Sequence, residues 1–245
     1  MIIFLTSSPS GPLDKPNYDR KLDNSNFFLF NLKKYWKKEM KGLIICAFPD
    51  SYESNDEMKN FFYDAFKNSG LPFKSLDLWD NRIKSVDIYH YDFIMLAGGH
   101  VPTENKYFNE IDLRNKIKDY KGIVMGVSAG SMNSADIVYA QPELSGESID
   151  PNFKRFIKGL GITNINVLPH YQMIKENILD NQRLFEDITY LDSMYHSFYA
   201  LNDGSYILID SNGIHLYGES YLIKNGIRTQ ICTQNNIIKL NAIKK

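Results

Sequence analysis

Short apolar runs alternate with longer amphipathic segments along the first half of the chain. Several of the apolar runs are continuous rather than alternating, which is the pattern of strands that are covered on both faces. The predicted strands cover residues 2–6, 43–48, 74–78, 93–97 and 123–127.

Helices are predicted between these strands, over residues 25–40, 55–68 and 105–118. Ser25 is a suitable N-cap for the first helix, and the second is expected to stop at Ser69-Gly70. Because strand and helix repeat in turn, we expect a doubly wound, mostly parallel sheet with right-handed crossovers.

The pattern changes after Tyr190, where β-like runs are shorter and are separated by turn residues. Asn-Gly and Asp-Gly steps fall between them, and such steps indicate hairpins. We therefore expect antiparallel C-terminal strands that extend the same sheet, and an α/β fold in a single domain over residues 1–245. The runs cover residues 198–201, 206–210, 214–217, 220–223 and 227–233.

Composition narrows the class of protein. The chain has 245 residues, with 28 Lys+Arg against 29 Asp+Glu, and this balance argues against a nucleic-acid partner. Cys46 and Cys232 form no ligand cluster, so no metal is predicted. No run approaches the ~20 apolar residues of a membrane span, so we expect a cytoplasmic protein without a membrane partner. A homodimer is left open.

The strongest chemical signal is the run Gly126-Val127-Ser128-Ala129-Gly130, which follows a predicted strand and precedes a helix-compatible segment. A nucleophile elbow has this context. The small residues allow a tight, strained turn that exposes the serine hydroxyl. Ser128 is therefore the candidate nucleophile, and the N–H of Ala129 is free to meet an oxyanion.

A second glycine signal, Ala97-Gly98-Gly99-His100, follows the strand over 93–97. If the two strands are neighbours in a parallel sheet, this loop lies beside Ser128 and the Gly99 N–H becomes a second oxyanion donor. A serine nucleophile also needs a base. Spacing alone leaves the histidines open, with His170 first among them because it follows a strand-like run. The other histidines are His90, His100, His196 and His215.

These motifs together resemble the dipeptidase E and cyanophycinase family of serine peptidases. The resemblance rests on 97–100, on Gly126-Val-Ser-Ala-Gly-Ser131, on Gly159-Leu-Gly-Ile162 and on Leu168-Pro-His-Tyr171. It implies a fold like that of the class I glutamine amidotransferases. It also implies cleavage next to aspartate, with Ser128 as nucleophile, His170 as base and Gly99 and Ala129 as oxyanion donors.

The third member of the triad has two candidates. Asp203 resembles the acidic residue that precedes a glycine turn in this family, and Glu143 corresponds to another acidic position fifteen residues after the serine. A carboxylate must orient the histidine, and we prefer Asp203. The sequence departs from the family at His100, where an amide or acid is usual. We expect the His100 imidazolium to bind the substrate's aspartyl carboxylate.

The sequence therefore predicts a serine peptidase of short peptides, such as Asp-X dipeptides, with no metal or organic cofactor. One alternative is an esterase of the α/β-hydrolase type, in which His215 serves as base with Asp203 or Asp210 as acid. A second is a catalytically inactive regulator that binds a peptide or metabolite.

Overall fold

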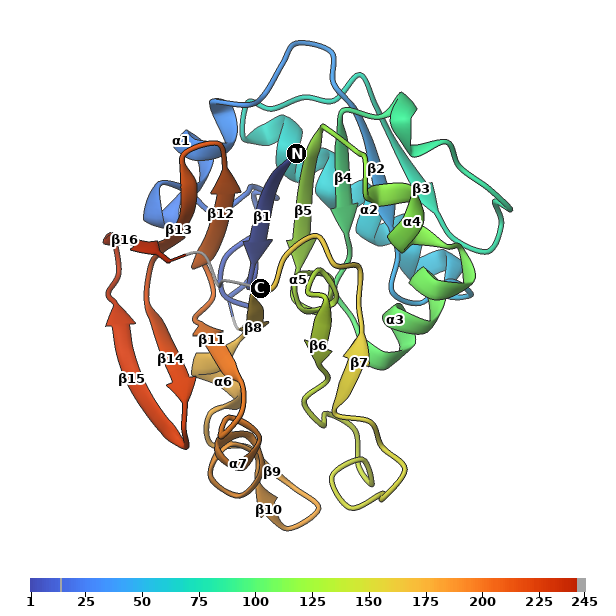
Figure 1. Cartoon of the computed structure of the whole chain (residues 1–245). Helices are drawn as coiled ribbons and strands as arrows, with labels where there is room; N and C mark the ends of the chain where they lie inside the picture. The colour runs from blue at the N-terminus through green and yellow to red at the C-terminus, as the bar shows by residue number, and fades with distance from the viewer. Residues whose placement is uncertain (14, 242–245) are drawn as a thin grey trace.

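A computed structural model describes residues 1–13 and 15–241, and an eight-stranded sheet runs through it (Figure 1). The first five strands in the list below are parallel, and the last three are antiparallel to their neighbours. In spatial order the strands are β3 (Ser75–Trp79), β2 (Lys41–Ile45), β4 (Phe93–Leu96), β5 (Ile123–Val127), β1 (Ile2–Thr6), β12 (Tyr206–Asp210), β13 (Gly213–Tyr217) and β16 (Ile237–Leu240).

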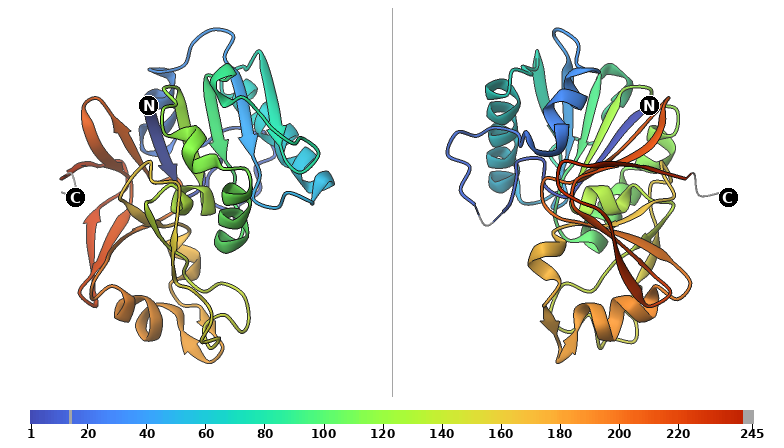
Figure 2. Two further views of the ribbon diagram at one scale, coloured as in Figure 1. Left: turned by 45° about the vertical axis from the view of Figure 1, so that its right-hand side comes forward. Right: turned by 90° about the vertical axis from the view of Figure 1, so that its left-hand side faces the viewer.

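Helices cover both faces of the parallel part. The helices α1 (Phe28–Lys33) and α2 (Tyr52–Asn68) lie on one face, and α3 (Val101–Glu110) and α4 (Leu113–Ile117) lie on the other (Figures 1 and 2). The continuous apolar runs predicted strands that are covered on both faces, and the structure confirms this.

Two of the predicted helices are shorter than expected. The helix predicted over 25–40 is a 3₁₀ turn, η1 (Ser25–Phe27), followed by α1, which ends at Lys33. Beyond it the chain turns so that Trp36 stacks on Phe66 of α2. The helix predicted over 105–118 is divided into α3 and α4, because Asp112 has a left-handed backbone with φ of 53°. A further 3₁₀ turn, η2 (Ile88–His90), precedes β4.

The C-terminal strands are divided between two sheets, which corrects the expectation that all of them extend one sheet. The strands β12, β13 and β16 do extend it, whereas a second sheet has the order β15 (Ile227–Cys232), β14 (Ser220–Lys224), β11 (Ser197–Leu201) and β8 (Asn166–Leu168). Gly204 and Gly218 have positive φ angles of 81° and 88°. At these two glycines the chain turns from one sheet into the other.

Short elements gather at the carboxyl ends of the parallel strands (Figure 1). They surround the turn that contains Ser128 and lie near β8, so the site is built where the two sheets approach each other. These elements are α5 (Ala129–Asn133), β6 (Ile137–Tyr139), β7 (Phe156–Lys158), α6 (Tyr171–Ile174), β9 (Ile178–Leu179), β10 (Gln182–Arg183), the π-helical turn η3 (Leu184–Thr189) and α7 (Tyr190–Asp192).

The buried apolar side chains form two clusters. One surrounds the parallel strands and their helices, and the other lies around α5, β8 and the second sheet. The first strand contributes to both, because Phe4 belongs to the first cluster while Ile3 and Leu5 belong to the second. Within the described part of the chain, we find no helix that is long and apolar enough to cross a bilayer.

Candidate active site

Ser128 lies in a strained turn between β5 and α5. Its backbone has φ of 51° and ψ of −113°, a conformation that side-chain-bearing residues rarely adopt. Two glycines make room for this turn. A Cβ at Gly126 would lie 2.6 Å from the Ser131 Cα, and one at Gly130 would lie 2.3 Å from the Leu96 carbonyl oxygen. A strand, a tight turn at Ser128 and a helix therefore follow one another as the sequence analysis expected, and the role of Ser128 as a nucleophile stays a prediction.

The loop with Gly98 and Gly99 lies beside this turn, as expected, because β4 and β5 are neighbours and Leu96 pairs with Gly126. Gly99 is also closely packed from behind, since a Cβ there would lie 2.5 Å from the Ala47 Cβ. Both Gly99 and Ala129 line the cavity that contains Ser128. No described residue accepts a hydrogen bond from either of these two N–H groups. Two N–H groups without a protein partner among the described residues therefore belong to residues that line the same cavity as Ser128.

His170 connects Ser128 to a carboxylate. Its Nε2 lies 2.9 Å from the Ser128 Oγ, and its Nδ1 lies 2.7 Å from the Asp203 Oδ1. His170 follows β8, which lies in the second sheet, and its backbone is left-handed with φ of 56°. Its N–H donates to the Ser7 Oγ at 2.8 Å. Ser128, His170 and Asp203 thus form one chain of hydrogen bonds that spans the two sheets.

Asp203 is almost fully enclosed, with a side chain that is 1% exposed, and it accepts four hydrogen bonds. One comes from His170, and the others come from the Ser7 hydroxyl, the Gln172 amide and the Leu13 N–H. Burial favours the neutral acid, but the hydrogen bonds and the charge of His170 outweigh it and hold the pKa of Asp203 below its ordinary value of 3.8. The carboxylate is therefore ionised and fixed in place.

Ser7 and Gln172 were not predicted from the sequence as site residues. Ser7 follows β1, which lies between β5 and β12 in the sheet, so it reaches the same edge as Ser128. Its position directly after a predicted strand was a usable signal. Gln172 lies two residues after His170, and its Oε1 also accepts the Asp203 N–H at 3.0 Å. Only the fold reveals that contact, because Asp203 is distant in sequence.

His100 does not take the position that the sequence analysis expected. It lies outside the cavity, and both of its ring nitrogens have partners within the chain. Nδ1 lies 2.8 Å from the Thr103 Oγ1, and Nε2 lies 2.8 Å from the Glu147 Oε1. These contacts occupy both ring nitrogens and connect His100 to Thr103 in α3 and to the loop that contains Glu147.

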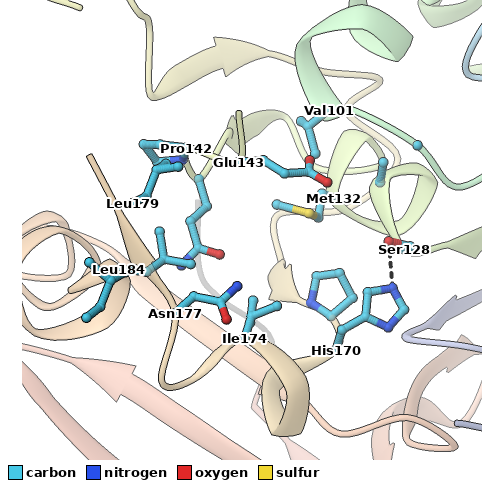
Figure 3. A pocket seen from close by; sticks show the side chains of 15 residues that line it. Val101, Ser128, Met132, Pro142, Glu143, His170, Ile174, Asn177, Leu179 and Leu184 are labelled. Carbon is cyan, nitrogen blue, oxygen red and sulfur yellow. Dashed lines mark hydrogen bonds between the residues drawn. The ribbon is translucent and has the colours of Figure 1, made fainter. Parts of the chain in front are cut away.

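Glu143 also has a place other than the triad. Its carboxylate lies in the cavity, on the side near Val101 and Met132 (Figure 3). Partial burial and the charge of Glu147 raise the pKa of Glu143, although His100 and His170 oppose this effect. The Nδ1 of His170 is hydrogen-bonded to Asp203 and not to Glu143.

The cavity next to Ser128 has a volume of about 290 Å³, close to the lower limit for small-molecule sites. Ser128 and His170 lie at one end, Leu179 and Leu184 lie at the other, and Ile174 lies between them (Figure 3). In residues 1–13 and 15–241 no group of three or more His, Cys, Asp or Glu is arranged to hold a metal ion. The arrangement suits attack by a serine hydroxyl on a small carbonyl substrate.

Comparison with known proteins agrees with this geometry. A model of peptidase family S51 matches residues 32–217. A peptidase from an acI-B1 Actinobacterium has a similar structure, with a TM-score of 0.65 and 17% identity over 98% of this chain and 96% of that one. A putative peptidase E protein from Listeria monocytogenes EGD-e has a TM-score of 0.54 and 16% identity over 94% of this chain and 98% of that one. No curated protein sequence matches significantly.

The two solved structures have the same α/β fold. The family match covers most of the chain, including the elbow and the strand that leads to His170. The chain therefore belongs to peptidase family S51 and is a serine-type peptidase.

Proposed function

We propose that this peptidase hydrolyses short peptides with Ser128 as the nucleophile, His170 as the general base and Asp203 as the residue that orients His170. The observation that supports the proposal best is the pair of contacts made by His170, 2.9 Å to the Ser128 Oγ and 2.7 Å to the Asp203 Oδ1. Both distances lie within normal hydrogen-bond range.

In the first half of the reaction, the Ser128 Oγ attacks the scissile carbonyl carbon while His170 Nε2 takes the hydroxyl proton. The carbonyl oxygen becomes an oxyanion, and the N–H groups of Gly99 and Ala129 are placed to donate to it. The Asp203 carboxylate accepts a hydrogen bond from the Nδ1–H of His170 and stabilises the imidazolium. When the C–N bond breaks, His170 gives its Nε2 proton to the leaving amine.

In the second half, a water molecule replaces the leaving amine. His170 Nε2 takes a proton from this water as its oxygen attacks the acyl carbon of the Ser128 ester. The second oxyanion forms in the same place as the first. When it collapses, the ester bond breaks and the proton on His170 returns to the Ser128 Oγ, which restores the free enzyme.

Specificity for Asp-X dipeptides stays a prediction from the family resemblance. An aspartyl side chain in a partly desolvated pocket needs a cation or several donors. Among the described residues that line the cavity, none is an arginine or a lysine, and the neutral amides of Gln141 and Asn177 are the side-chain donors besides His170 and Ser128. A panel that compares Asp-Leu with Leu-Leu measures this preference directly.

The proposed roles are tested with Ser128→Ala. We expect a loss of about 10³-fold or more in kcat, because the triad acts as a unit. Ser134→Ala is the matched control, since this buried serine is in the turn after α5 and its hydroxyl donates only to the Gly130 carbonyl. Retention of more than a tenth of wild-type turnover by Ser128→Ala would contradict the assignment.

A substrate panel and a fluorophosphonate label distinguish the peptidase from the two alternatives, an esterase and an inactive regulator. An esterase would prefer esters to peptides in a substrate panel, but His215, its candidate base, lies in β13, three strands away from β5. A regulator without catalysis would not be labelled by a fluorophosphonate. We expect labelling of native wild-type protein, and none of heat-denatured protein or of Ser128→Ala.

A further inference from the structure

The cavity beside Ser128 carries one acidic group in surroundings that are otherwise apolar or neutral, apart from His170. Among the described residues that line it, Glu143 is the sole carboxylate, and no lysine or arginine neutralises it. Glu143 is exposed as a residue, so solvent reaches it, but no cation among the lining residues pairs with its carboxylate. Such a group is stabilised when a ligand brings a positive charge.

The place of the carboxylate limits which charge can reach it. Figure 3 shows the Glu143 carboxylate on the same side of the cavity as Met132 and Ser128, while Leu179 and Leu184 lie at the far side. A ligand group next to Glu143 is therefore close to the reacting carbonyl. A long basic side chain would extend instead toward the aliphatic end, where the described lining residues offer no carboxylate.

The loop that contains Glu143 is held from its own side by Glu147. The Glu147 Oε2 accepts the N–H groups of Glu143 and Leu144, at 2.8 and 3.0 Å. The Glu147 Oε1 is bonded to the His100 Nε2 at 2.8 Å. Because His100 directly follows Gly99, these contacts connect the Glu143 loop to the loop that carries the proposed oxyanion donor.

The same loop is held from the opposite side by Asp180, in the turn between β9 and β10. Its carboxylate accepts the Gly146 N–H at 2.9 Å and the Ser148 hydroxyl at 2.8 Å. Leu179, which precedes it, lines the cavity. The loop that carries the acidic group and the aliphatic end are thus parts of one connected structure, and the backbone of Glu143 is held in position before a substrate arrives.

We propose that Glu143 binds the free α-ammonium group of the substrate's N-terminal residue, and that the aliphatic end of the cavity receives an apolar side chain of that residue. This rests on the proposed function, because the α-ammonium is placed relative to the carbonyl that Ser128 attacks. In the N-terminal residue, one α-carbon carries the carbonyl, the α-ammonium group and the side chain. In this arrangement the carbonyl contacts Ser128, the α-ammonium group contacts Glu143, and the side chain contacts the aliphatic end of the cavity. The substrates are short peptides with an unblocked, apolar N-terminal residue.

The test compares four substrates with one variant and its control. The substrates are Leu-Ala, N-acetyl-Leu-Ala, Asp-Ala and Lys-Ala, and the variant is Glu143→Gln. Glu110→Gln is the control, because Glu110 is at the exposed end of α3 and pairs only with Lys106. The wild type is expected to cleave Leu-Ala with a kcat/KM about 10- to 100-fold above that for N-acetyl-Leu-Ala, the range of one charge-assisted hydrogen bond.

Glu143→Gln should lower kcat/KM for Leu-Ala by about 10- to 100-fold and leave that for N-acetyl-Leu-Ala unchanged, while Glu110→Gln matches the wild type. An equal loss on both substrates would overturn the proposal, because Glu143 would then serve the chemistry or the fold. Equal cleavage of both by the wild type would overturn it as well. A preference for Asp-Ala or Lys-Ala over Leu-Ala would overturn the apolar specificity.

Fluorophosphonate labelling keeps the two proposals distinguishable. Suppose that the wild type and Glu143→Gln are both labelled at Ser128, but that the wild type cleaves Leu-Ala and N-acetyl-Leu-Ala equally well. This result would overturn the ammonium site alone. A wild type that is not labelled at Ser128 would remove the proposed function and this inference with it.

Discussion

Asp203 is held by more groups than orientation of a single histidine requires. Ser7 donates to its Oδ1 at 2.7 Å and also accepts the backbone N–H of His170. One hydroxyl therefore contacts both Asp203 and His170. Gln172 holds the other oxygen and the backbone N–H of Asp203. The left-handed backbone of His170 is thus held on both sides. The Ser7 hydroxyl accepts its N–H, and the N–H groups of Met173 and Ile174 in α6 donate to its carbonyl.

The first prediction concerns Ser7→Ala. Removal of the hydroxyl leaves the buried His170 N–H without a partner and takes one hydrogen bond from Asp203, at a cost of about 1–3 kcal/mol. We expect kcat to fall about 10-fold with little change in KM, because the imidazole loses its alignment. Ser8→Ala is the matched control, since Ser8 is also buried but donates to the Gly11 carbonyl. Equal kcat values for the two variants would contradict this role.

The second prediction concerns acid stability. The pKa of Asp203 lies below 3.8 in the folded chain. Its ionised form therefore adds stability that is fully present above the unfolded pKa and is lost as the pH falls through the lower, folded pKa. The free energy of unfolding of the wild type should exceed that of Asp203→Asn at pH 7, and the difference should shrink steadily below about pH 4. A difference that stays constant from pH 7 to pH 2.5 would refute this.

The sequence predicted those residues of the site whose roles depend on local backbone. The elbow around Ser128 and the glycine pair follow directly from short-range steric requirements, and the structure has them where they were expected. Residues whose roles depend on the opposite sheet could not be predicted in the same way. Asp203 and Glu143 both remained candidates, and His100 was assigned to the substrate, because sequence gives no distance to Glu147.

At the scale of elements, two loops close the cavity and are tied together at Asp180. The turn of β9 and β10 holds this residue in a left-handed backbone with φ of 50°. Its carboxylate accepts the N–H groups of Gly146 and Ser148, which keeps its pKa below the ordinary value. The position of the Glu143 loop therefore depends on an element more than thirty residues later.

The third prediction concerns Asp180→Asn. Asparagine tolerates the same backbone conformation but offers one neutral acceptor oxygen instead of two charged ones. The weaker fixation of the loop should raise KM about five-fold and leave kcat nearly unchanged. Asp150→Asn is the control, because the side chain of Asp150 accepts hydrogen bonds only from Asn152, in its own turn. A change in kcat without a change in KM would argue against a loop that positions substrate.

The elements of the first half were predictable because each one buries a continuous apolar face. Those of the second half were predictable as strands but not as members of a particular sheet. Strands of both sheets bury apolar side chains, as Phe198 of β11 and Leu208 of β12 do. The chain passes between the sheets at Gly204, at Gly218 and at Asn235, which all have positive φ angles. A glycine in the sequence does not reveal which sheet the chain enters.

At the scale of the whole molecule, the strand β1 contributes side chains to both apolar clusters. Neighbouring residues of β1, Phe4 and Leu5, point into different clusters, and both are fully buried. The proposed site uses residues from both sheets, since Ser128 follows β5 and His170 follows β8. We therefore propose that the chain unfolds as one cooperative unit, which is the single domain expected from the sequence.

The last prediction follows from this sharing of β1. Phe4→Ala should cost about 3–5 kcal/mol and Leu5→Ala about 2–5 kcal/mol of unfolding free energy. Tryptophan fluorescence reports on the first cluster, because Trp36 and Trp79 both belong to it. Fluorophosphonate labelling of Ser128 reports on the second, where Ala129 and Met132 are buried. In urea, each variant should lower the midpoints of both probes together. Ile237→Ala, at a side chain that is 48% exposed, should move them little. Two separated midpoints, with Leu5→Ala affecting labelling alone, would show that the clusters unfold independently.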